Sequence, residues 1–197
     1  MRHARPWTAL WAILPILIGL SPGSSRAGAP AADTASSDLV SGVWRHHKAA
    51  FDYGGFTSLY TCDGLESHVL DILRHLGARK DIRVSATGCP GPSNTPSRTA
   101  RVDAEFSSLA PLPAASALDA VKARWTALEV TPRRPAFMGD GDCELVQAMK
   151  DLITQNFSLR DLEYRTNCVP HELLLDSFAI KGQVFKAVPS NSMGVKG

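Results

Sequence analysis

Two segments of the chain show the same order of hydrophobic and polar positions. A first set of matches lies 81 residues apart: Trp44 with Trp125, Phe56 with Phe137, and Cys62 with Cys143. A second set lies 80 residues apart and pairs Leu65, Val69, Ile72 and Leu73 with Leu145, Met149, Leu152 and Ile153. Self-similarity at a fixed offset is typical of an internal repeat. The pattern therefore predicts a unit that occurs twice in tandem.

A helical period follows the first cysteine of each copy. Apolar residues recur three or four positions apart: Leu65, Val69, Ile72 and Leu76 in the first copy, and Leu145, Met149, Leu152 and Ile153 in the second. In the first copy, Asp63 followed by Glu66 predicts an N-cap with a capping box, and Gly77 predicts the helix end. Each copy is therefore expected to contain one amphipathic helix.

Strand patterns surround each predicted helix. Apolar and polar residues alternate over 82–87 and 100–107 in the first copy and, less regularly, over 162–167 and 178–185 in the second, with opening strands at 43–51 and 124–130. One helix and three strands bury too little apolar surface to be stable alone. We therefore predict an α+β fold in which two tandem β-α-β-β repeats share an antiparallel or mixed sheet, with the two helices on one face.

The chain begins with the pattern of a cleavable signal peptide. Arg2 and Arg5 precede an uncharged apolar run from Trp7 to Leu20, and Ser21-Pro22-Gly23 ends that run. The apolar run is shorter than the roughly 20 residues that span a membrane, so no permanent membrane anchor is expected. Cleavage after Ala27 would export the protein to the periplasm or the exterior.

These patterns divide the chain into six parts. They are a signal peptide (1–27), a flexible N-terminal tail (28–40), the first repeat (41–110), a linker (111–120), the second repeat (121–188) and a flexible C-terminal tail (189–197). The full chain has 21 Lys and Arg against 19 Asp and Glu, and three of these arginines lie in the signal peptide. No clustered basic face remains to indicate nucleic-acid binding.

The four cysteines, Cys62, Cys89, Cys143 and Cys168, all lie in the exported part of the chain. An even number of cysteines in an oxidising compartment predicts disulfides. Counting leaves three possible pairings, but each copy holds one cysteine at its helix start and one after the following strand. The duplication therefore favours Cys62–Cys89 and Cys143–Cys168. At the 80-residue offset Cys168 aligns with Gly88 rather than with Cys89. A shift of one residue within a strand would turn the side chain to the opposite face of the sheet. Cys89 must therefore lie beyond the end of its strand, or the two disulfides must differ in geometry.

The segment Tyr60-Thr61-Cys62-Asp63-Gly64-Leu65-Glu66, with Gly55-Phe56-Thr57 before it and Gly88-Cys89-Pro90 after it, resembles a family of uncharacterised exported proteins of proteobacteria. The likeness covers most of the exported chain. No activity is assigned to this family, so the resemblance supports export and the cysteine pattern without implying a function. The second copy departs from the segment, because Asp142-Cys143-Glu144 stands in its place.

Four histidines are candidates for metal binding or acid–base chemistry. His46 and His47 are adjacent in a predicted strand, so their side chains point to opposite faces and cannot hold one ion together. His68 and His75 lie seven residues apart on the first predicted helix, whereas a helical metal site usually sets its histidines four apart. We interpret His68 and His75 as helix-surface residues and predict no metal site.

The acidic segment from Gly139 to Glu144 has the alternating carboxylates of a calcium loop. A complete EF-hand loop requires a glutamate at the twelfth position, where this chain has Asp151 within the second predicted helix. We interpret Asp142 instead as the cap of that helix and Glu144 as a partner of its dipole. Trp44, Trp125, Phe56 and Phe137 are interpreted as matched core anchors.

No nucleophile motif, redox Cys-x-x-C motif or phosphate-binding glycine loop is present in the sequence. The favoured hypothesis is a non-enzymatic binding or interaction module of the cell envelope or exterior, with no cofactor, whose partner is a protein, a peptide or a small ligand. The alternative is a small hydrolase or metal-dependent enzyme that uses His46 or His47 with carboxylates assembled by the fold.

Overall fold

The computed structural model describes residues 39–89, 95–112 and 119–189. Its elements are β1 (Val40–Gly54), α1 (Cys62–His75), β2 (Arg83–Thr87), β3 (Thr99–Pro111), β4 (Val121–Val130), the 3₁₀ helix η2 (Asp140–Asp142), α2 (Cys143–Ala148), α3 (Lys150–Asn156), β5 (Leu159–Thr166) and β6 (Phe178–Ala187). The predicted signal peptide, most of both predicted tails and most of the linker lie outside these residues.

All six strands form one antiparallel sheet, with the order β2-β3-β1-β4-β6-β5. The prediction of an α+β fold with a shared antiparallel sheet is thus confirmed. Each half of the sheet has its opening strand at the centre, its last strand beside it and its middle strand at the edge. The second predicted helix is divided at Met149 into α2 and α3.

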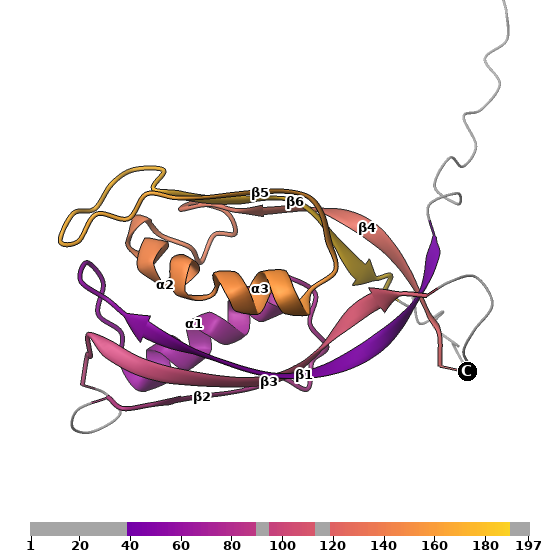
Figure 1. The fold of residues 1–197 in the computed structure, drawn as a ribbon, viewed down its shortest axis with the longest axis horizontal. Helices are drawn as coiled ribbons and strands as arrows, with labels where there is room; N and C mark the ends of the chain where they lie inside the picture. The colour runs from indigo at the N-terminus through magenta and orange to yellow at the C-terminus, as the bar shows by residue number, and fades with distance from the viewer. Residues whose placement is uncertain (1–38, 90–94, 113–118, 190–197) are drawn as a thin grey trace, which may run out of the picture. The chain divides into compact units, whose positions relative to one another are not determined.

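The two halves of the sheet join over a short stretch. β1 pairs with β4 only from Val40 to Gly42, whereas it pairs with β3 from Gly42 to Gly54. Beyond Gly42 the two halves separate, and the three α-helices lie between them (Figure 1). Within the described part of the chain, no helix is long and apolar enough to cross a membrane.

The space between the halves is filled by one apolar core. Fully buried side chains of this core come from the helices and from strands β3 and β6: Leu65, Val69, Leu73, Leu76, Val102, Phe106, Leu145, Met149, Ile153, Phe178, Ile180 and Val184. These are the stripe residues of the predicted helices and the inward positions of the strands. Full burial of a side chain such as Leu contributes roughly 1.5–3 kcal/mol, so this core is the main source of stability.

The start of α1 differs from the prediction. Thr61, not Asp63, is the N-cap, and its Oγ1 accepts a hydrogen bond from the Gly64 N–H at 2.9 Å. Glu66 does not complete a capping box, because its Oε1 accepts from the Ala86 N–H of the edge strand β2 at 2.7 Å. A helix side chain therefore satisfies a backbone donor that an edge strand would otherwise leave free. The predicted end of α1 is confirmed, since Gly77 has φ +93° just beyond it.

The interpretation of the four matched aromatic residues as core anchors is wrong. Trp44 and Trp125 are half-buried outside the main core, in a second cluster with Leu109, Ala123 and Phe185 at the junction of β1 and β4. Phe56 and Phe137 are exposed. Both phenylalanines lie in loops that connect a strand to a helix rather than in strands, and a loop side chain need not face the core.

The cysteine pairing follows the prediction. Cys62 is bonded to Cys89, and Cys143 is bonded to Cys168. Cys89 lies two residues beyond the end of β2 and Cys168 two residues beyond the end of β5, so neither cysteine interrupts a strand. Each disulfide ties the start of a helix to the strand that follows it, and such a cross-link typically contributes about 2–4 kcal/mol.

Candidate functional site

Three loops meet at one end of the separated sheet halves. They are residues 55–61 between β1 and α1, residues 131–142 between β4 and α2, and residues 167–177 between β5 and β6. We call these three loops the loop end. It lies opposite the junction of β1 with β4 (Figure 1), and the first two loops occupy the same place in each half of the fold.

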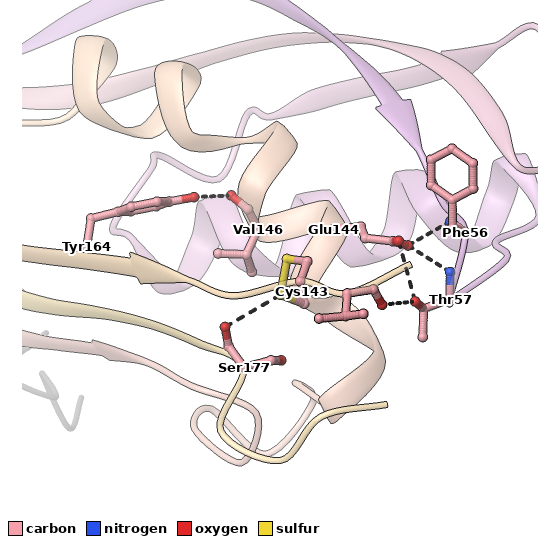
Figure 2. The surroundings of a disulfide bond; sticks show 9 residues. Phe56, Thr57, Cys143, Glu144, Val146, Tyr164 and Ser177 are labelled. Carbon is pink, nitrogen blue, oxygen red and sulfur yellow. Dashed lines mark hydrogen bonds between the residues drawn. A yellow bond between two sulfur atoms is a disulfide. The ribbon is translucent and has the colours of Figure 1, made fainter. Parts of the chain in front are cut away.

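Glu144, in the first turn of α2, holds the loop of the other half. Its Oε2 accepts from the backbone N–H groups of Phe56 and Thr57 at 2.8 and 3.0 Å, and the Thr57 hydroxyl lies 3.4 Å from Oε1 (Figure 2). Hydrogen bonds to a charged acceptor are stronger than those between neutral groups. The interpretation of Glu144 as a dipole partner is thus incomplete, because the carboxylate binds residues 56–57.

The third loop is fixed at its base. The Thr57 hydroxyl lies 3.3 Å from the carbonyl oxygen of Val169, and the Cys143–Cys168 disulfide joins the same loop to α2. The Asn167 N–H donates to the Ser177 carbonyl at 2.7 Å and closes the loop. Figure 2 shows these groups gathered around the start of α2. The three loops are therefore joined to each other and to both halves of the sheet.

A buried carboxylate lies beneath these loops. Asp142 is only 6% exposed, and its side chain accepts hydrogen bonds from the Tyr60 hydroxyl and, at 2.6 Å, from the Gly139 N–H. His68 Nε2 lies 3.2 Å from its Oδ2. Burial would raise the pKa of Asp142, but the contacts with His68, Tyr60 and Gly139 together hold that pKa below its ordinary value. Asp142 does not cap α2 with its side chain, which corrects the sequence interpretation.

The two helix histidines face the second half of the fold rather than water. The His68 ring lies between the rings of Tyr60 and Phe137, with centroids 5.7 and 5.8 Å away. His75 Nε2 lies 3.3 Å from the carbonyl oxygen of Glu129. Burial, followed by the charge of Lys186, lowers the pKa of His75. The prediction of surface histidines is wrong because residues 131–138 pack over this face of α1.

His46 and His47 point to opposite faces of β1, as predicted. His46 Nε2 lies 3.0 Å from Glu105 Oε1 on the exposed face, and His47 Nε2 lies 2.9 Å from the Ser108 hydroxyl on the helix face. Burial, followed by the charges of His46 and Arg45, lowers the pKa of His47. Both histidines thus have partners on β3, and neither belongs to the loop end.

Carboxylates and histidines do not gather into a metal site in the part of the chain that the structure describes, since no three such side chains or cysteines are suitably arranged. Within the acidic segment 139–144, Asp142 binds Tyr60 and Gly139, and Glu144 binds residues 56–57. These carboxylates are therefore used in joining the two halves of the fold.

The outer surface of the loop end carries uncovered apolar side chains. Phe56 is 54% exposed, Leu59 47%, Leu173 66% and Leu175 71%, and Phe137 is also exposed. Phe56 lies edge-on against His171 at 5.9 Å. We call Phe56, Leu59, Phe137, Leu173 and Leu175 the apolar surface.

The loops that carry the apolar surface approach one another closely at Gly141. A Cβ atom at this position would lie 2.2 Å from the Ser58 hydroxyl oxygen and 3.7 Å from Leu173 Cδ2. The close approach therefore requires the absence of a side chain here, and it places Leu173 beside the other two loops.

One feature of the sequence indicates the apolar surface, although hydrophobic periodicity does not detect it. Leu173, Leu174 and Leu175 form an apolar run between two predicted strands, where turn residues are expected. The contribution of Tyr60 had no such signal, because its partner Asp142 lies 82 residues away in the sequence.

The chain matches no protein-family model, no curated protein and no solved structure. The function must therefore be inferred from the geometry of the loop end.

Proposed function

We propose that this chain is an exported, disulfide-stabilised protein that binds a segment of another protein through the apolar surface of its loop end. The observation that carries the proposal is the exposure of Leu173 and Leu175, at 66% and 71%, in a loop that contacts the loop carrying exposed Phe56 and Leu59. Soluble proteins rarely expose neighbouring large apolar side chains, and such groups mark interaction sites. Large apolar and aromatic side chains are also the usual anchors of protein interfaces.

The rigidity of the loops supports this proposal. Glu144 binds the loop that carries Phe56 and Leu59, and the Cys143–Cys168 disulfide fixes the loop that carries Leu173 and Leu175. A surface that is already ordered loses little conformational entropy on binding, so more of the contact free energy appears as affinity. The contacts of Asp142 with Tyr60 and Gly139 also order residues 131–142 and join them to the loop of residues 55–61.

Export to the periplasm or the exterior is supported by residues 1–27, which have the signal-peptide pattern, and by the two disulfides. Disulfides persist in oxidising compartments and are rare in reducing ones.

Duplication of one β-α-β-β unit is supported by the matching order of strands in the two halves of the sheet. Under this proposal, residues 55–61 and 131–142 are the same loop in two copies. The binding surface is then formed where the equivalent loops of both copies meet, and neither copy would provide it alone.

The alternative, a small hydrolase or metal-dependent enzyme, is favoured by one contact, that of His68 with Asp142. A carboxylate that orients a histidine is part of many nucleophilic sites. Here, however, Asp142 also binds Tyr60 and Gly139, and all four cysteines are in disulfides. The observed contacts therefore account for Asp142 as a structural link, and we favour binding.

Selection from a displayed library of random peptides tests the proposed function. The exported chain, immobilised, is expected to enrich peptides with apolar residues, and Leu173→Ser combined with Leu175→Ser is expected to abolish the enrichment. Leu162→Ser is the matched control, because Leu162 is an exposed leucine of β5 and lies outside the loop end. Equal enrichment on all three proteins, or none on the parent, would refute the proposed function.

A further inference from the structure

Around the apolar surface, negatively charged side chains outnumber positively charged ones. The loop end contains no lysine, and its two arginines are already in ion pairs. Arg133 lies 3.8 Å from Asp176, and Arg134 lies 3.0 Å from Glu129. The arginines of these loops are thus matched by carboxylates, while the exposed Arg98, whose carbonyl oxygen accepts from the Gly55 N–H, lies next to the first loop.

Three further acids lie in the loop end or directly after it in the chain and have no ion pair among the described residues, and one carboxylate oxygen of Asp140 is buried. Asp140 and Glu172 belong to the loop end, and Asp63 lies in the first turn of α1. Glu172 directly precedes Leu173, and Asp140 directly precedes Gly141, which lies beside Leu173. The carboxylate of Glu144 adds negative charge nearby, because its donors at residues 56 and 57 are neutral. The surface therefore combines apolar anchors with a negative border.

The combination of apolar anchors with a negative border restricts the kind of partner that could bind there. A membrane with anionic lipids would be repelled by the acidic border, since membrane-binding apolar loops and helices normally carry Lys and Arg. A protein segment with acidic residues would be repelled in the same way. Complementary charge at the border of an interface favours encounter and fixes the orientation of the partner.

We infer that the partner segment carries Lys or Arg residues on both sides of its apolar anchors; this inference rests on the proposed function. The apolar residues of the segment contact Phe56, Leu59, Leu173 and Leu175. Its basic residues lie against Asp63, Asp140 and Glu172. Such contacts are exposed to solvent, so each contributes a few-fold to affinity at low salt, and together they give a preference of about 10-fold.

Three synthetic peptides test the inference. They share one central stretch of leucine and phenylalanine, which is flanked by lysines, by serines or by glutamates, and their binding to the exported chain is measured by fluorescence anisotropy. The lysine-flanked peptide is expected to bind about 10-fold more tightly than the glutamate-flanked one. Raising the ionic strength from about 0.05 to 0.5 M should reduce this difference, because salt screens exposed charges.

Two double variants locate the preference. Asp140→Asn with Glu172→Gln is expected to reduce the preference for lysine flanks to less than about 3-fold. Asp103→Asn with Glu163→Gln removes the same charges from strands β3 and β5, away from the loop end, and should leave the preference unchanged. A preference that survives the first pair of substitutions would overturn the inference.

The outcomes separate this inference from the proposed function. Equal binding of the three peptides, lost on combining Leu173→Ser with Leu175→Ser, would refute the charge preference and leave the binding surface intact. Binding of no peptide, or binding that ignores the leucine substitutions, would refute both. Vesicles of phosphatidylglycerol and phosphatidylcholine are expected not to sediment the protein. Sedimentation that depends on Leu173 and Leu175 would identify a membrane as the occupant and overturn the inference.

Discussion

The loop end and the β1–β4 junction both carry matched aromatic residues, but these residues are packed at the junction and exposed at the loop end. At the junction, the Arg79 guanidinium lies 5.9 Å from the Trp44 ring centroid and that of Arg160 lies 4.5 Å from the Trp125 ring centroid. Each tryptophan also packs in the second cluster with Phe185 and Leu109. At the loop end, Phe56 and Phe137 remain exposed.

The contrast shows which aromatic residues stabilise the fold and which are available to a partner. An arginine stacked on an aromatic ring covers the ring and contributes a cation–π attraction. The junction thus uses its aromatic residues internally. The loop end instead places its polar groups inside, around Asp142, and its apolar groups outside. This inverted arrangement is difficult to explain by stability alone, and it is the arrangement on which the proposed binding function rests.

The largest effect is expected from the carboxylate beneath the loop end. Asp142→Ala leaves the buried Tyr60 hydroxyl and the Gly139 N–H without their acceptor and His68 without its contact. Loss of one partner from a buried charged network typically costs about 3–5 kcal/mol. Urea denaturation should show this decrease, and Asp142→Asn, which keeps the acceptor oxygen, should lose less. A near-neutral Asp142→Ala would show that the network does not hold the loops.

The junction tryptophans should give a smaller loss. Truncation of a fully buried tryptophan costs roughly 3–5 kcal/mol, but Trp44 and Trp125 are half-buried, so about 2–3 kcal/mol is expected for each. Trp125→Ala should cost more than Trp44→Ala, because Trp125 also contacts the Phe185 ring at 5.2 Å and has the closer arginine. Chemical denaturation of both variants beside the parent measures the difference. Losses in the reverse order would contradict this account of the junction.

These two regions also show how far the sequence could predict the molecule. The alternation of residues 100–107 and the helical period from Leu65 to Leu76 predicted a strand and a helix that the structure contains, because both patterns are local. The cysteine pairing was predicted from the similarity of the two segments, each of which has one cysteine at a helix start and one after the following strand. The role of Asp142 could not be predicted, since its neighbours in sequence are those of a helix start and its main partner, Tyr60, is in the other half of the chain.

The exposure of the two matched phenylalanines could not be predicted from the sequence either. Phe56 and Phe137 have the same spacing from Trp44 and Trp125, and an apolar residue at a repeated position is most simply interpreted as core. Burial depends on whether another part of the chain covers the side chain, and spacing carries no such information. The apolar surface was therefore found only once the three loops had been placed together.

A smaller effect on stability is expected from pH, and it arises at the partly buried His47 and His75. Burial lowers the pKa of His75 and of His47 below the ordinary value of 6.5. The unfolded chain therefore takes up protons on these residues at a higher pH than the folded chain does, so their stabilising contribution is present above about pH 6.5 and is lost as the pH falls. The midpoint of urea denaturation should decrease from pH 7.5 to 5.5.

His75→Gln tests the source of this pH dependence. Glutamine can donate to the Glu129 carbonyl as the neutral imidazole does, but it does not titrate. The variant should therefore show a shallower dependence on pH, with the remaining slope due to His47. A slope that is the same in the parent and in His75→Gln would contradict the assignment.

The smallest effect on stability is expected at the two leucines that we propose as anchors for the partner. Leu173 and Leu175 are largely exposed, so replacing both with Ser removes little buried apolar area, and such surface changes usually stay within about 0.5 kcal/mol each. Chemical denaturation should give nearly the parental midpoint, while peptide binding is lost. The same experiment on Trp44→Ala should give the opposite result, with a lower midpoint and retained binding under conditions where the variant is folded. If Leu173→Ser with Leu175→Ser destabilised the protein as much as the tryptophan variants, the two leucines would be part of the fold's own packing, and the contrast between the loop end and the junction would not hold.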